Sequence, residues 1–183
     1  MAESGFIVCV PEAEARVGSL RERFDASAAA GVPAHITVLF PFMAPALIDD
    51  RVLTQVAAAL AAVPAFAFTL ERVERFSTTT WLAPEPAAPF VALTNRLVQA
   101  FPAFLPFSGE FDSVIPHLTV AHGDARDADR AQAELSRAMR RHGAIQVRCA
   151  AVMLMENSSG RFQLRHTLAL AAPDPTPDPA PAR

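Results

Sequence analysis

A short pattern occurs twice in this chain and constrains its fold more than any other feature. The first copy, residues 33–40, reads PAHITVLF, and the second copy, residues 116–121, reads PHLTVA. Each contains His-x-Thr with apolar residues in the gaps, and His35 and His117 are 82 residues apart. Side chains alternate between the two faces of a β-strand, so each copy predicts a strand with one imidazole and one hydroxyl on the same face. Two such strands indicate two halves of one acid–base site.

The same spacing of 82 residues relates the segments that follow the two motifs. The helical pattern over 46–62 maps onto 128–144, the strand pattern over 66–76 onto 148–158, and the short strand over 79–83 onto 161–165. Each half is therefore predicted to contain a motif strand, a helix, a strand, a turn and a second strand. Because a repeated unit decides the topology, we interpret the chain as an internal duplication.

Three further segments complete the predicted fold. Residues 6–10 form a short apolar strand, and residues 12–24 and 88–101 have the apolar spacing of amphipathic helices bounded by prolines. The sequence predicts an α+β fold: a bilobal, pseudo-two-fold arrangement of antiparallel sheets with outer helices around a central groove. Residues 1–171 are expected to form one bilobal domain, and residues 172–183 a disordered tail in which every second residue is proline.

Composition limits the partners that this chain can have. It contains 16 arginines, no lysine and 19 acidic residues, for a net charge of −3. Proteins that bind long nucleic acids carry a basic excess, so we expect a small nucleotide or an RNA end rather than a long duplex. No apolar run approaches the roughly 20 residues of a membrane helix, and the first residues lack a signal-peptide pattern. We therefore expect no membrane association, a cytoplasmic location and, by default, a monomer.

The two histidines and two threonines suit a reaction that removes one proton and delivers another. Imidazole has an ordinary pKa near 6.5, which lets one ring be neutral while the other is charged. In phosphodiester cleavage, one histidine would deprotonate the attacking hydroxyl or water and the other would protonate the leaving oxygen. The hydroxyls of Thr37 and Thr119 would donate hydrogen bonds to the non-bridging oxygens. Neither a metal nor a cofactor is required for this chemistry.

Residues 32–42 and 115–121 resemble the two motifs of the two-histidine phosphoesterase superfamily, the group of 2′-5′ RNA ligase (LigT-like) and cyclic phosphodiesterase proteins. The resemblance extends by pattern over roughly residues 4–171. It implies a bilobal α+β fold and metal-independent activity on 2′,3′-cyclic phosphates or 2′-5′ linkages. It also implies that His35 and His117 are the acid–base pair, with His117 as the base in hydrolysis, and that Thr37 and Thr119 bind the phosphate.

Four other residues are weaker candidates for lining the substrate. The chain has no tyrosine, so Trp81 or Phe42 would have to stack on a nucleobase. The 82-residue offset maps the strand of Trp81 beside the first half of the site. Arg161 and Arg165 lie in the matching strand of the second half, where a guanidinium could reach a phosphate.

The remaining histidines and the two cysteines are interpreted as structural. His122 is expected on the strand face opposite His117, His142 at a helix C-terminus, and His166 on a packed face. Cys9 and Cys149 lie in apolar strands and are expected to be buried, reduced thiols.

Two rival functions remain open at this stage. One is a metal-dependent hydrolase with His35, His117 and Asp112 as ligands, although a dense cluster of ligand residues is lacking. The other is a module that binds a nucleotide or RNA end without turnover. A histidine-triad nucleotide hydrolase is excluded, because that motif needs alternating histidines within one strand.

Overall fold

The structure, a computed structural model, describes residues 2–110 and 113–172. The strands are β1 (Ser4–Cys9), β2 (His35–Leu39), β3 (Phe66–Arg75), β4 (Thr79–Glu85), β5 (Leu118–His122), β6 (Ile145–Cys149), β7 (Ala151–Glu156) and β8 (Gln163–Ala169). The helices are α1 (Glu14–Phe24), α2 (Ala26–Ala29), α3 (Asp50–Leu60), α4 (Ala88–Ala100) and α5 (Ala125–His142), with short 3-10 turns at Pro11–Ala13, Pro45–Leu47 and Pro106–Gly109.

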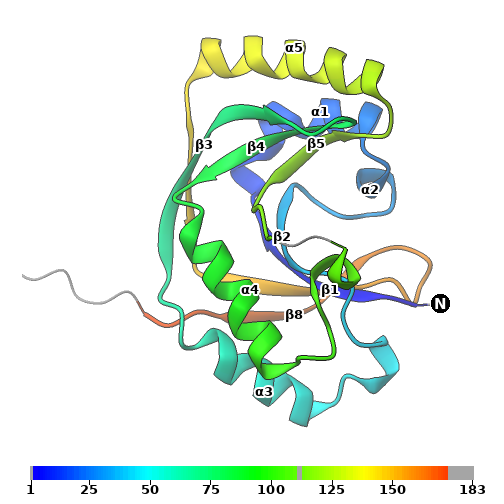
Figure 1. Cartoon of the computed structure of the whole chain (residues 1–183), viewed down its shortest axis with the longest axis vertical. Helices are drawn as coiled ribbons and strands as arrows, with labels where there is room; N and C mark the ends of the chain where they lie inside the picture. Colours follow the sequence, from blue (N-terminus) through cyan, green and yellow to red (C-terminus); the bar gives the residue numbers. More distant parts are fainter. Residues whose placement is uncertain (1, 111–112, 173–183) are drawn as a thin grey trace, which may run out of the picture.

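All eight strands pair antiparallel in one sheet, in the order β6-β3-β4-β5-β2-β1-β7-β8. The sheet is strongly curled, with α1 and α5 beside one half and α3 and α4 beside the other (Figure 1). The predicted α+β fold is confirmed. The separate sheets expected for the two lobes are the two halves of this one sheet, because Ile36 of β2 pairs directly with Leu118 of β5.

The duplication differs from the simple offset of 82 residues in one respect. The counterpart of β4 is β1, not β8, since β1 and β4 each flank a motif strand. The prediction that β4 matches residues 161–165 is therefore wrong, and β8 is an edge strand beside β7. An offset follows the order of segments along the chain, whereas strand neighbours are chosen by hydrogen bonding, and β3 and β4 cross into the half that contains β5.

One face of the sheet packs against the helices and forms the main core. Along β2 and β5 the buried residues alternate as predicted, with Ile36, Val38, Leu118 and Val120 all at most 2% exposed. Helix residues in the same core include Val17, Leu20, Val56, Leu60, Leu93, Leu97, Leu135 and Met139. We call this the helix-covered face, and the opposite face, which carries His35, Thr37, His117 and Thr119, the site face.

Local sequence signals explain where the helices begin and end. The Asp49 carboxylate accepts a hydrogen bond from the Val52 N–H at the start of α3, and Asp124 does the same for Asp127 in α5. Gly143, with a φ of 72°, ends α5 directly after His142. Strand β6 was not predicted, because the 82-residue offset placed a helix over 128–144 and a strand over 148–158, a division that falls within β6. The four-residue helix α2 was not predicted because it is too short for a helical period.

The remaining sequence expectations divide between the described residues and those outside them. Both cysteines are free thiols; Cys149 is buried and Cys9 is half-buried. Burial raises the pKa of Cys149 to about 11, which keeps this thiol protonated at neutral pH. Within the described ranges, no helix combines the length and apolar character needed to cross a membrane. Residues 173–183 of the predicted tail lie outside the described residues.

Candidate active site

The two motifs meet at the centre of the sheet, where β2 lies beside β5 (Figure 1). The Ile36–Leu118 pair sets the antiparallel register, in which His35 lies opposite Thr119 and Thr37 lies opposite His117. All four side chains are only partly buried, whereas their apolar neighbours along the strands are fully buried. The structure therefore brings the four predicted residues together on the site face, and we call them the quartet.

The rings of His35 and His117 are oriented by the same kind of hydrogen bond to a backbone carbonyl. The Nδ1 of His35 lies 2.7 Å from the Pro33 carbonyl oxygen, and the Nδ1 of His117 lies 2.7 Å from the Ile115 carbonyl oxygen. A carbonyl oxygen can only accept, so in each neutral ring Nδ1 carries the proton and Nε2 carries the free lone pair. Each ring is thus oriented with a basic nitrogen available for a substrate.

The electrostatic environment keeps both rings neutral in the free protein. Burial is the main cause that lowers the pKa of His35, to about 4, and the nearby Arg21 and His117 lower it further. Burial also lowers the pKa of His117, with a contribution from His122. The hydroxyls of Thr37 and Thr119 make no hydrogen bond with any other described residue, which leaves them free to donate to a ligand.

An irregularity of strand pairing follows both motifs. In each half the pairing of the motif strand with its outer neighbour shifts by one residue just after the threonine, as shown by the pairs Ile7–Thr37 and Phe6–Leu39 in the first half and Trp81–Thr119 and Thr80–Ala121 in the second. A β-bulge of this kind reverses the alternation of side chains beyond it. Phe40 follows the bulge in β2 and His122 follows the bulge in β5. These two residues therefore lie at equivalent positions on the site face.

Phe42 does not line the site, contrary to the sequence prediction. It is 6% exposed and packs in the core against Phe6 and Phe101, with ring centroids 4.8 and 5.2 Å away. The aromatic residue that follows the first motif on the site face is Phe40, which packs edge-on against Phe162 at 6.2 Å. Strict alternation from Thr37 would place both Phe40 and Phe42 on the helix-covered face. The bulge turns Phe40 to the site face, whereas Phe42 follows the end of β2 and its N–H donates to the Ser4 carbonyl oxygen at 2.8 Å.

Trp81 lies beside the second half of the site, not the first half that the offset indicated. It pairs with Thr119, and its ring centroid lies 5.6 Å from that of His117 and 4.9 Å from that of Phe76. Phe76, which the sequence analysis did not identify, also contacts His117 edge-on at 5.5 Å. Phe76 is 37% exposed and Trp81 only 7%, so Phe76 forms the accessible part of this aromatic wall.

The two candidate arginines are not part of the quartet. Arg165 lies 3.8 Å from Glu156 in a small pocket with Pro45, Ile48, Leu154 and His166, and Leu154 belongs to the helix-covered core. Arg161 is exposed in the turn before β8 and lies near Gly31, in the loop that precedes His35. The strand that carries both residues is at the sheet edge, since β8 does not match β4.

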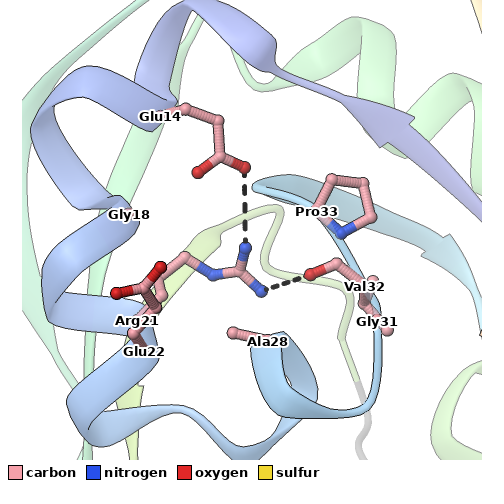
Figure 2. Close-up of a pocket in the computed structure, with 8 residues that line it drawn as sticks. All are labelled: Glu14, Gly18, Arg21, Glu22, Ala28, Gly31, Val32 and Pro33. Carbon is pink, nitrogen blue, oxygen red and sulfur yellow. Dashed lines mark hydrogen bonds and ion pairs between the residues drawn. The ribbon is translucent and has the colours of Figure 1, made fainter. Parts of the chain in front are cut away.

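A buried ion pair supports the loop that leads into His35. Arg21 is 2% exposed and donates to Asp25 at 3.1 Å and to the Val32 carbonyl oxygen at 3.0 Å. Glu14 accepts from the Ala34 N–H at 2.7 Å and lies 3.9 Å from Arg21, as Figure 2 shows for the Glu14, Arg21 and Val32 contacts. These contacts fix the backbone on both sides of Pro33, whose carbonyl orients the His35 ring.

A pocket of about 240 Å³ lies between α1 and this loop (Figure 2). Its lining residues are Glu14, Gly18, Arg21, Glu22, Ala28, Gly31, Val32 and Pro33. None of the quartet lines it, so it borders the site through the Pro33 segment without containing the reactive side chains.

The rival metal site can be compared with the described residues. Within residues 2–110 and 113–172, no three His, Cys, Asp or Glu side chains are grouped so that they could hold a metal ion. Asp112, the third ligand in that hypothesis, lies outside the described residues.

Comparisons with known proteins identify a matching family and a similar fold. The sequence of residues 9–161 matches the family model of the 2′-5′ RNA ligase superfamily. The fold is similar to that of Escherichia coli LigT in its apo form (TM-score 0.55, 17% identity), with NADP⁺ (0.55, 18%) and with 3′-AMP (0.53, 18%), each alignment covering 92% of this chain and 97% of LigT. No curated protein sequence matches the chain significantly.

Proposed function

Because the chain belongs to the 2′-5′ RNA ligase superfamily, we propose that it is a metal-independent phosphodiesterase that acts on 2′,3′-cyclic phosphates or 2′-5′ linkages of nucleotides or RNA ends. The observation that carries the proposal is the quartet, in which each imidazole lies opposite the threonine of the other motif. Two bases and two hydroxyl donors on one rigid surface match the needs of phosphoryl transfer.

The proposed mechanism places the phosphoryl group over the Ile36–Leu118 pair. The hydroxyls of Thr37 and Thr119 donate to its non-bridging oxygens and stabilise the charge of the transition state. One histidine takes a proton on Nε2 from the attacking water, and the other, protonated on Nε2, gives its proton to the leaving oxygen. In a cyclic substrate this step breaks one P–O bond of the ring and leaves a phosphate monoester.

Substrate binding would supply the proton that the acid needs. Burial keeps both rings neutral in the free protein, but a bound phosphate anion favours the imidazolium form and raises the pKa of each ring. His35 has its pKa lowered to about 4, which favours this residue as the base. The family resemblance implies the reverse assignment, with His117 as the base, and NMR titration of both rings with bound phosphate distinguishes the two.

The aromatic wall supports a nucleotide as the substrate. Phe76 and Trp81 adjoin His117, and Phe76 is accessible enough for a nucleobase to stack on it. We propose that Trp81 lies behind Phe76 and supports it, and that the base of the substrate lies on this side of the quartet.

The test is hydrolysis of the four 2′,3′-cyclic mononucleotides and of 2′-5′-linked diadenosine in excess EDTA. We expect turnover by the unmodified protein, and a loss of about 10²- to 10⁴-fold in His35→Ala and in His117→Ala, the usual contribution of a general acid or base. His142→Ala is the matched control, because His142 is exposed at the end of α5.

Three outcomes would contradict the proposal. Turnover that EDTA abolishes would favour a metal-dependent hydrolase. Binding of the nucleotides without turnover would favour a binding module. Turnover that survives both alanine substitutions would place the reactive groups elsewhere.

A further inference from the structure

A third histidine lies on the site face, although the sequence predicted it on the opposite face. The bulge in β5 turns His122 so that it pairs with Thr79. Thr79 shares its face of β4 with Trp81, which contacts His117. The side chains of His122 and Thr79 are in direct contact, with Nδ1 2.8 Å from Oγ1, so His122 lies on the same face as the quartet.

The partner of this ring gives it the opposite chemistry from His35 and His117. Those two rings face carbonyl oxygens, which can only accept a hydrogen bond, whereas His122 faces a hydroxyl, which can donate one. Thr79 is 7% exposed, and among the described residues its hydroxyl has Nδ1 of His122 as its one acceptor. A buried hydroxyl that donates to Nδ1 leaves the proton of the neutral ring on Nε2. His122 therefore presents an N–H donor, where His35 and His117 present lone pairs.

The position of His122 suits a group adjacent to the reacting phosphate. Two residues lie between Thr119 and His122, and the three steps of extended strand span at most about 10 Å at the usual rise per residue. A separation of this size lets His122 bind a different group from the one that Thr119 contacts. It fits a second group of the same ligand, one sugar away.

The surroundings favour an anion as that group. His122 is exposed, and its backbone forms a bridge with Asp25, which lies between α1 and α2. The Asp25 carboxylate is already occupied by Arg21 and by the N–H and hydroxyl of Ser27, so Arg21 balances its charge. Asp124, two residues further on, accepts from the Asp127 N–H at the start of α5.

We propose that His122, oriented by Thr79, binds a second phosphate of the substrate, one ribose away from the phosphate held by the quartet. The inference rests on the proposed function, because the quartet must hold the first phosphate. It predicts that the protein prefers nucleotides or RNA ends that also carry a 5′-phosphate over their 5′-hydroxyl counterparts.

The test compares the binding of adenosine 3′-monophosphate and adenosine 3′,5′-bisphosphate by isothermal titration calorimetry at fixed ionic strength. We expect the unmodified protein to bind the bisphosphate roughly tenfold more tightly, the size of one hydrogen bond to a charged group. The affinity ratio is the dissociation constant of the monophosphate divided by that of the bisphosphate. In His122→Ala this affinity ratio should fall to within about twofold of one, while His142→Ala should keep the ratio of the unmodified protein.

The Thr79→Val variant tests whether His122 binds the second phosphate as an oriented N–H donor or only through a positive charge on its ring. This variant keeps His122 but removes the hydroxyl that fixes its tautomer, so the ratio should fall part of the way. A full ratio in Thr79→Val would contradict the role of Thr79.

The outcomes distinguish this inference from the proposed function. Equal binding of both compounds to the unmodified protein, or a full ratio in His122→Ala, would overturn the inference and leave the proposed function standing. Failure of the unmodified protein to bind either compound would also overturn the inference, whereas the proposed function is decided by the turnover assay in EDTA.

Discussion

His35 and His117 lie diagonally across the Ile36–Leu118 pair, so that each imidazole faces the threonine of the other motif. This relationship follows from one antiparallel pairing at the centre of the sheet. Neighbouring strands are held about 4.8 Å apart by their backbone hydrogen bonds, so the two rings are positioned by the fold and need no ligand to bring them together. Because the two rings need not be reorganised during the reaction, they can stabilise the charge of the transition state more effectively than flexible groups.

Removal of either threonine hydroxyl should slow the reaction with little effect on folding. Thr37→Val and Thr119→Val keep the shape of a partly buried strand residue but remove a donor to the phosphate. We expect each to lower kcat/KM by about 100-fold, similar to the loss of one oxyanion donor. Thr54→Val in α3, whose hydroxyl bonds to the Asp50 carbonyl, serves as the control. Full activity in either motif variant would contradict the proposed equivalence of the two halves.

The lowered pKa of His35 should make the protein less stable in mild acid. Below pH 6.5 the unfolded chain protonates this ring first, because the pKa of the folded state is about 4. The ring therefore lowers the free energy of unfolding progressively as the pH falls from about 6.5 to 4. Urea unfolding at several pH values should show a smaller loss over this range in His35→Ala than in the unmodified protein or in His142→Ala. Equal slopes in all three proteins would show that the pKa of His35 is not lowered.

Arg21 should be among the most important charged residues for stability. Arg21→Met leaves the Asp25 carboxylate buried without its partner, and removal of one member of a buried pair costs about 3–5 kcal/mol. The matched control is Arg23→Met, because the Arg23–Glu134 pair is exposed and such pairs contribute about 0–1 kcal/mol. Urea unfolding of both variants measures the difference. Similar urea midpoints for the two variants would contradict the role of the buried Arg21–Asp25 pair in supporting the loop before His35.

Two glycines should respond to alanine in opposite directions. A Cβ at Gly5 would lie 2.7 Å from the Phe40 ring and 3.0 Å from the Leu39 carbonyl oxygen, so we expect Gly5→Ala to destabilise by about 1–3 kcal/mol. Gly18 lies within α1, where a Cβ would lie 3.1 Å from Oε2 of Glu14, the carboxylate oxygen that does not bond to Ala34. Gly18→Ala should therefore be neutral or stabilise by up to about 1 kcal/mol. Thermal unfolding measures both, and a destabilising Gly18→Ala would show that the Glu14 carboxylate cannot move.

Much of the fold was predictable because its signals are local. The alternation around His35 and His117 predicted both strands and the shared face of the histidine and threonine in each motif. The apolar spacing also predicted α1, α3, α4 and α5 to within a few residues. Strand β6 was missed although Ile145, Val147 and Cys149 alternate as buried residues, because the 82-residue offset placed a helix over 128–144 and a strand over 148–158, a division that falls within this segment.

The errors at the site come from pairing, which is not local. His122 was placed on the wrong face because a bulge forms only when two strands align. Phe42 was chosen for its place just after the first motif, which does not show that the chain turns into the core beyond β2. Trp81 was assigned to the wrong half because the offset does not record which strands become neighbours. Phe76 gave no signal in the sequence, since its contact with His117 depends on the β3–β4 turn folding over β5.

The sequence by itself determined the chemistry of this site: two imidazoles and two hydroxyls, each pair on one face of a strand, because side-chain alternation is a property of the extended backbone. Only the tertiary structure decided how these groups face one another and what surrounds them. The Ile36–Leu118 pair, the two bulges and the buried Arg21–Asp25 pair each join residues that lie apart in the chain or that change their environment on folding. Their energies depend on packing and desolvation, which exist only once the sheet has formed.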